Sequence, residues 1–143
     1  MSFYEALIRA HIVSGMLLFA LALTSVSLAV MIAVKPAEDP ANLKLLTRAN
    51  FVGWIEISTA GIASLTGIIA MFLGSWPLTE MWLWLSLVIM LFYMSALKRV
   101  TKPSRQVVAV GGSQIKSGMQ VVMHVCHMLL IIVAWSLMLL KPA

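Results

Sequence analysis

The sequence contains very little charge for its length. Of its 143 residues only 10% are Asp, Glu, Lys or Arg, whereas 62% are hydrophobic; a soluble domain is usually about one quarter charged and about half apolar. The mean hydropathy is +1.00. A soluble fold of this length would expose much of that apolar surface to water. The composition therefore excludes an ordinary soluble domain and predicts a protein whose outer surface contacts lipid.

The sequence also lacks the residue patterns of several common function classes. Its single cysteine, Cys126, allows no internal disulfide bond. It has no phosphate-binding glycine loop, no EF-hand and no nucleophile paired with a base. Its basic residues are not interleaved with aromatic residues, as they are at many nucleic-acid interfaces. A hydrolase, a kinase and a nucleic-acid-binding protein therefore have no support from the residues.

Four long apolar runs make up most of the chain. Each is close to the ~20 residues that a helix needs to cross ~30 Å of hydrocarbon. We expect one transmembrane domain over residues 1–143, an all-α integral membrane four-helix bundle with up-down-up-down topology. Membrane lipid is then one partner, and a homo-oligomer or a larger membrane complex is the other expected assembly. The runs are Ile8–Val34, Phe51–Leu73, Met81–Leu97 and Gly118–Leu140.

Basic residues are concentrated on one side of the expected bundle. Eight fall in the first and third connections, whereas Arg9 and Lys141 lie at the other side. The positive-inside rule then predicts that both basic connections face the cytoplasm and that both termini lie outside it. We expect the membrane to be a bacterial inner (plasma) membrane. The eight residues are Lys35, Lys44, Arg48, Lys98, Arg99, Lys102, Arg105 and Lys116.

Ionisable side chains inside apolar runs are candidate site residues, because burying them in a bilayer is expensive. Glu56 lies about 8 Å and His124 about 9 Å inside their runs, both counted from the basic side at 1.5 Å per residue. Tyr93, Ser25 and Ser27 fall in the same half. We expect one polar layer, which either forms a proton site or ties the helices together. A hydrogen bond between transmembrane helices contributes about 0.6 kcal/mol.

The three histidines are candidate cofactor ligands. His124 and His127 are spaced i,i+3 and therefore project from one face of the last helix, as a haem contact or a proton relay requires. Zinc usually takes four ligands, so we expect no metal-ion site here. His11 begins an unbroken apolar run on the opposite side. We expect Glu80 to approach His11 or Arg9 there, most simply as an interfacial ion pair.

Several short motifs resemble the HemJ and CopD-like family of small membrane proteins. The resemblance implies a four-helix bundle associated with haem and, in HemJ, with the oxidation of protoporphyrinogen. It also implies His11 as a haem ligand. Family members carry a Lys early in the third helix, where this sequence has Trp84. The motifs are Arg9-Ala-His11-Ile-Val-Ser-Gly15, Leu65-Thr66-Gly67, an aromatic third run that ends in basic residues, and a final Leu-Leu-Lys141-Pro142.

Three functions remain open at the level of sequence. A haem- or redox-associated bundle would use His11 on one side, or His124 and His127 on the other, and the resemblance favours it. An accessory subunit of a larger membrane complex is consistent with short connections and no soluble module. A small oligomeric ion or proton transporter would place Glu56 and His124 along its path.

Overall fold

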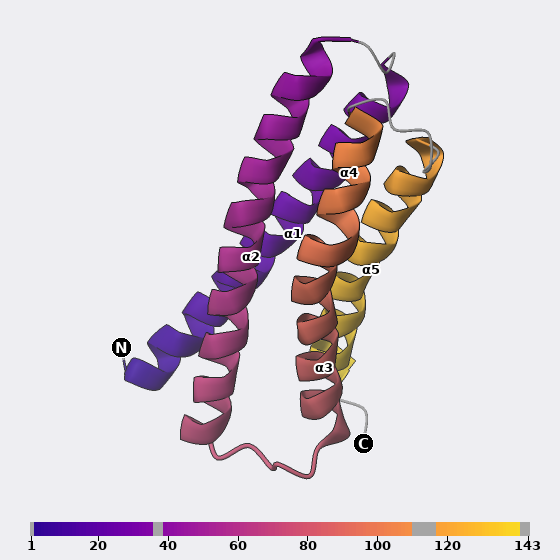
Figure 1. Ribbon diagram of the computed structural model, residues 1–143. Helices are drawn as coiled ribbons and strands as arrows, with labels where there is room; N and C mark the ends of the chain where they lie inside the picture. Colours follow the sequence, from indigo (N-terminus) through magenta and orange to yellow (C-terminus); the bar gives the residue numbers. More distant parts are fainter. Residues whose placement is uncertain (1, 36–38, 110–116, 141–143) are drawn as a thin grey trace.

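A computed structural model describes residues 2–35, 39–109 and 117–140 of the chain (Figure 1). These residues are almost entirely helical and include no strand. Four of the helical segments are long and apolar enough to cross a membrane, and the chain is an integral membrane protein with an all-α four-helix bundle. The elements are α1 (Phe3–Val34), α2 (Ala41–Leu73), α3 (Met81–Ala96), the π-helix η1 (Leu97–Thr101), α4 (Lys102–Ala109) and α5 (Ser117–Leu140).

Two helices begin well before their apolar runs. Helix α1 starts at Phe3 because Ser2 and Glu5 form a capping box, each bonding the other's backbone N–H. Helix α2 starts at Ala41, whose N–H donates to the Asp39 carboxylate at 2.9 Å. Its 33 residues span about 50 Å at 1.5 Å per residue, well beyond the ~30 Å of hydrocarbon. The apolar run that begins at Phe51 therefore forms only the later part of α2, and Asp39-Pro40 marks the start of the helix.

The third helix continues past the end predicted at Leu97. Helices α3, η1 and α4 follow one another without a break as far as Ala109. Pro103 has no N–H to donate, and the wider turn of η1 directly before it accommodates that loss. The Thr101 hydroxyl donates to the Leu97 carbonyl at 3.2 Å within this turn. The basic residues that follow the apolar run therefore extend the helix instead of ending it.

The packing order of the helices determines where space remains in the bundle. Helix α1 crosses behind the others and packs along both α2 and α5, and α3 packs on α5 (Figure 1). At the basic end α4 reaches α1 and α2, where Ala109 joins a core cluster with Ile32 and Ala49. Toward the opposite end α2 and α3 contact each other only slightly. The bundle is thus closed at its basic end and looser at the end that carries both termini.

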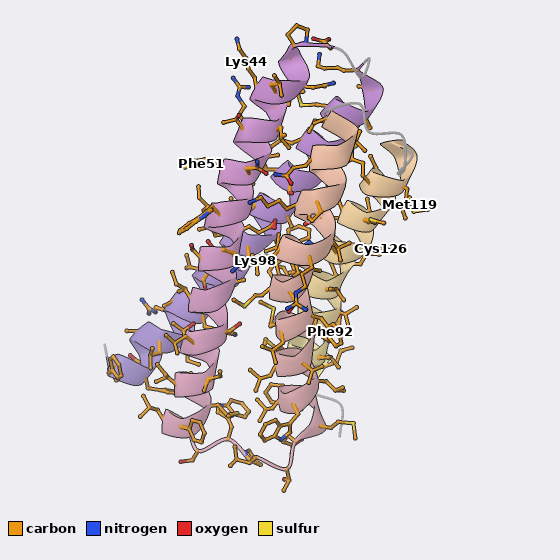
Figure 2. The ribbon with its side chains drawn as sticks, in the orientation of Figure 1. Lys44, Phe51, Phe92, Lys98, Met119 and Cys126 are labelled. Atoms are coloured by element: carbon orange, nitrogen blue, oxygen red, sulfur yellow. The ribbon has the colours of Figure 1, made fainter. Side chains whose placement is uncertain are left out.

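The outer surface of the helices is apolar, as lipid requires. Phe51 and Phe92 are 68% and 66% exposed, and both point away from the bundle in Figure 2. Cys126 is also exposed on α5 and contacts no site. Lys44 lies near the basic end of α2, whereas Lys98 of η1 lies about half-way along the bundle (Figure 2).

Candidate functional site

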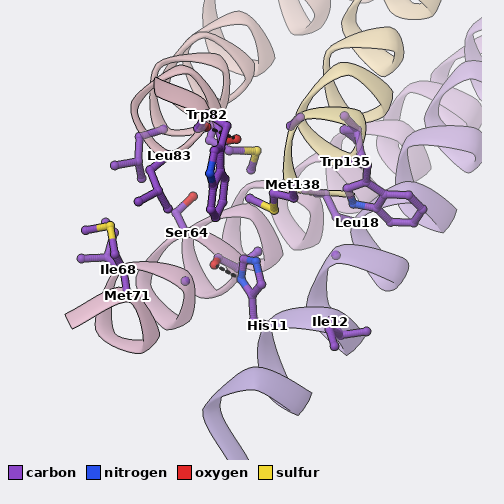
Figure 3. A pocket seen from close by; sticks show the side chains of 18 of the residues that line it. His11, Ile12, Leu18, Ser64, Ile68, Met71, Trp82, Leu83, Trp135 and Met138 are labelled. Atoms are coloured by element: carbon purple, nitrogen blue, oxygen red, sulfur yellow. Dashed lines mark hydrogen bonds between the residues drawn. The ribbon is translucent and has the colours of Figure 1, made fainter. Parts of the chain in front are cut away.

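An apolar cavity of about 370 Å³ lies between α1, α2, α3 and α5, in the half of the bundle away from the basic connections (Figure 3). Trp82 and Trp135 provide aromatic walls, and Met71 and Met138 provide thioethers. Trp82 is buried and meets Trp76 edge-on, with ring centroids 5.8 Å apart. The walls therefore suit a flat, largely apolar molecule.

His11 of α1 projects into this cavity (Figure 3). Its Nδ1 lies 2.7 Å from the Ala63 carbonyl oxygen of α2. Because a carbonyl can only accept, Nδ1 must carry the hydrogen, and in the neutral ring Nε2 is then a hydrogen-bond acceptor. The inter-helix bond thus determines both the tautomer and the orientation of the ring.

Helix α2 is shaped to receive the imidazole ring. A Cβ atom on Gly67 would lie 2.8 Å from His11 Cε1, so only glycine lets the ring sit this close to α2. The Thr66 hydroxyl bonds the same Ala63 carbonyl at 3.1 Å. Of the Leu65-Thr66-Gly67 motif, only Gly67 accommodates His11 directly, because the Thr66 hydroxyl bonds backbone carbonyls of its own helix.

Ser64 is the cavity residue that sequence reasoning missed. Its Oγ is buried and has no hydrogen-bond partner among the residues that the structure describes. Figure 3 shows Ser64 and His11 facing the same space beneath Trp82. Ser86 also lines the cavity, but its hydroxyl donates to the Trp82 carbonyl at 2.7 Å. The only signal for Ser64 in the sequence was a hydroxyl one turn from Gly67.

A separate polar layer lies nearer the basic end. Glu56 of α2 and Tyr93 of α3 are both fully buried, and the two side chains lie near enough to influence each other electrostatically. The His127 ring of α5 stacks on Tyr93 with centroids 3.9 Å apart and planes 12° from parallel. Its Nε2 donates to the Tyr93 carbonyl at 2.8 Å. The structure thus brings together residues that lie far apart in the sequence.

The two histidines of α5 each use one ring nitrogen on a backbone carbonyl. His124 Nδ1 lies 2.6 Å from the Gln120 carbonyl, one turn earlier. Gln120 is fully buried, and its Nε2 donates to the Ala29 carbonyl of α1 at 2.7 Å. Gln120 is a second buried polar residue that sequence reasoning missed. Among the described residues, no three His, Cys, Asp or Glu side chains lie close enough together to hold a metal ion.

Some of the expected groupings are wrong. Ser25 is buried, but Ser27 is exposed and donates to the Leu23 carbonyl of its own helix at 2.9 Å, because residues two apart face opposite sides of a helix. Arg9 is exposed, and the described residues show no ion pair between Glu80 and either Arg9 or His11. His11 instead turns toward α2.

No family model, curated protein or solved structure matches this chain. Its function must therefore be inferred from its own residues.

Proposed function

We propose that this membrane protein binds a ring-bearing redox molecule from the bilayer, with His11 as its polar anchor. The hydrogen bond between His11 Nδ1 and the Ala63 carbonyl carries this proposal. Histidines that hold metals or cofactors usually donate their second ring N–H to a carbonyl or carboxylate in this way. The arrangement leaves the Nε2 lone pair for a ligand in the cavity.

The chemistry of the cavity supports a flat and mostly apolar ligand. Its volume of about 370 Å³ falls within the ~300–1,000 Å³ that is usual for small-molecule sites, near the lower end. Trp82 and Trp135 offer ring faces for stacking. Ile12 and Leu139, which also line the cavity, are 50% and 81% exposed, so the cavity is in communication with the lipid at α1 and α5.

Haem is one member of this ligand class, and the family resemblance favours it. His11 Nε2 would hold the iron, and Met71 or Met138 could supply a thioether, the second donor type in many cytochromes. Haem bound there would supply one-electron transfer. The protein's own contribution would be to orient the ligand through the Ala63 and Gly67 contacts and to exclude water.

The absorption spectrum and lipid extract of the protein, purified from native membranes in mild detergent, test this proposal. We expect a Soret band that His11→Phe removes, or a ring-bearing molecule in the extract whose amount His11→Phe reduces. Thr24→Ala is the matched control, since Thr24 lies on the same helix but is exposed and bonds only the Ala20 carbonyl. A colourless protein that retains no such molecule would contradict the proposal.

A second candidate function, proton transfer, is favoured by two ionisable side chains, Glu56 and Tyr93, that are both fully buried in the bundle and lie near each other. Ionisable groups at this depth in a membrane commonly mark proton or ion paths. His127 on Tyr93 and His124 one turn away extend the layer within α5. Proton flux into proteoliposomes tests this function. Flux that is unchanged by Glu56→Gln would remove the layer from any such path.

We further propose that the basic end faces the cytoplasm of a bacterial inner membrane, with both termini outside. The supporting observation is that Lys44, Arg48, Lys98, Arg99 and Lys102 are all exposed and that they lie in or beside the two connections at the same end of the bundle. A reporter fused after Ala143 tests the orientation. Alkaline phosphatase should be active there, whereas activity only of a cytoplasmic reporter would reverse the orientation.

A further inference from the structure

We infer that the ligand of the cavity is a lipophilic hydroquinone or phenol whose hydroxyl donates a hydrogen bond to His11 Nε2. This inference rests on the proposed function and names the ligand class of that site. It depends on three properties of the cavity: the direction of its hydrogen bonds, its lack of charge, and its contact with lipid.

The direction of hydrogen bonding selects a donor. With Nδ1 bonded to the Ala63 carbonyl, the neutral His11 ring presents only an acceptor to the cavity. A quinone, a ketone or an ester carries acceptors alone and leaves Nε2 without a partner. A phenolic hydroxyl satisfies it. Ser64, whose hydroxyl has no partner among the described residues, also lines the cavity.

The absence of charge selects a neutral molecule. No Lys, Arg, Asp or Glu belongs to the described lining of the cavity. A carboxylate or a phosphate would lose its hydration there without gaining a counter-ion, which is strongly unfavourable. This argues against a charged lipid headgroup. A single neutral ring with one or two hydroxyls meets the condition.

The mouth of the cavity accommodates an apolar tail. Ile12, Met16 and Leu139 belong to the lining and are 50%, 60% and 81% exposed. These apolar side chains lie on the lipid-facing surface of α1 and α5. A ring held at His11 can therefore extend an alkyl or isoprenoid chain directly into the bilayer.

Three ligands with the same alkyl tail test the inference on the full chain in lipid nanodiscs: a hydroquinone, its quinone and its dimethyl ether. Dissociation constants are measured by titration calorimetry. We expect the hydroquinone to bind about tenfold more tightly than the ether, as one hydrogen bond to a buried acceptor implies. The quinone should resemble the ether. His11→Phe should remove the preference and leave the affinity for the ether nearly unchanged.

A pair of glycine substitutions keeps the test decisive if His11→Phe does not fold. A Cβ on Gly67 would lie 2.8 Å from His11 Cε1 and 3.1 Å from Nδ1, so Gly67→Ala must displace the ring and reduce the hydroquinone preference. On the same helix, a Cβ on Gly61 would meet only Met94 Cε, at 4.0 Å. Gly61→Ala should therefore preserve the preference for the hydroquinone. Loss of the preference in Gly67→Ala alone supports the inference.

The remaining outcomes separate the inference from the proposed function. Equal binding of the three ligands would overturn donor recognition by His11 while leaving ring binding intact. A co-purified haem that is lost in His11→Phe would also overturn the hydroquinone assignment and support the broader proposal. If none of the three ligands binds and no haem is found, both are overturned.

Discussion

The two halves of the bundle bury their polar side chains in different ways. Near the basic end protein atoms surround Glu56, Tyr93 and His127, and His127 joins α5 to α3 through its ring face on Tyr93 and its bond to the Tyr93 carbonyl. In the opposite half His11 Nε2 and Ser64 Oγ face a cavity. The first arrangement uses polar groups to join helices. The second leaves them for a molecule that the chain does not itself provide.

The cause of the difference is how the third helix is placed. Past Tyr93 the η1 turn leads into α4, which packs on α1 and α2 and closes the basic end. Toward Trp82 the same helix diverges from α2, so space remains that side chains do not fill. One helix therefore determines both a packed layer and a cavity. Changes in the first half should act mainly on stability, and changes in the second mainly on binding.

The largest expected effect is on stability in the packed half. Tyr93→Ala removes a fully buried ring that stacks on His127, and such truncations typically reduce the free energy of unfolding by about 3–5 kcal/mol. The adjacent Phe92→Ala, at a lipid-exposed position, should change it by less than about 0.5 kcal/mol. Unfolding of the two variants in mixed micelles measures the contrast. Equal losses would contradict the division into halves.

A smaller effect is expected when one side chain is enlarged in each half. Ala60 is fully buried in the core cluster with Leu18 and Tyr93. Ala60→Leu should therefore overpack the core and lower the free energy of unfolding by about 1–3 kcal/mol. Ser64→Leu instead places its side chain in the cavity. We expect Ser64→Leu to lower the free energy of unfolding by less than about 1 kcal/mol, because it also removes a hydroxyl that has no partner among the described residues. Ser64→Leu should nevertheless abolish ligand binding. If the variant still binds the ligand, the binding site is not this cavity.

The smallest expected changes in stability distinguish two serines of the cavity wall, Ser64 and Ser86. Ser86→Ala removes a satisfied bond to the Trp82 carbonyl, worth about 0.6 kcal/mol between or within membrane helices. Ser64→Ala removes a hydroxyl with no described partner, so it should leave stability unchanged or slightly raised and weaken only ligand binding. Thermal unfolding with and without ligand compares them. Destabilisation by Ser64→Ala in the absence of ligand would assign that hydroxyl a structural role.

Part of this structure was predictable from the sequence. Hydropathy located four membrane-spanning helices, and counting from the basic side placed Glu56 and Tyr93 in the same half. It misjudged where the third helix ends, because basic residues that follow an apolar run can extend a helix instead of ending it. It also grouped Ser27 with the buried layer and overlooked Ser64.

What the sequence by itself determined is the number of membrane spans and the solvent around them, because crossing hydrocarbon requires a property that each segment carries alone. Only the tertiary structure decided which side chains face inward. In a soluble helix the apolar face marks the core, but here the lipid-facing surface is as apolar as the interior. Hydropathy therefore does not distinguish the two faces, and packing against neighbouring helices turned His11 toward a cavity and His127 onto Tyr93.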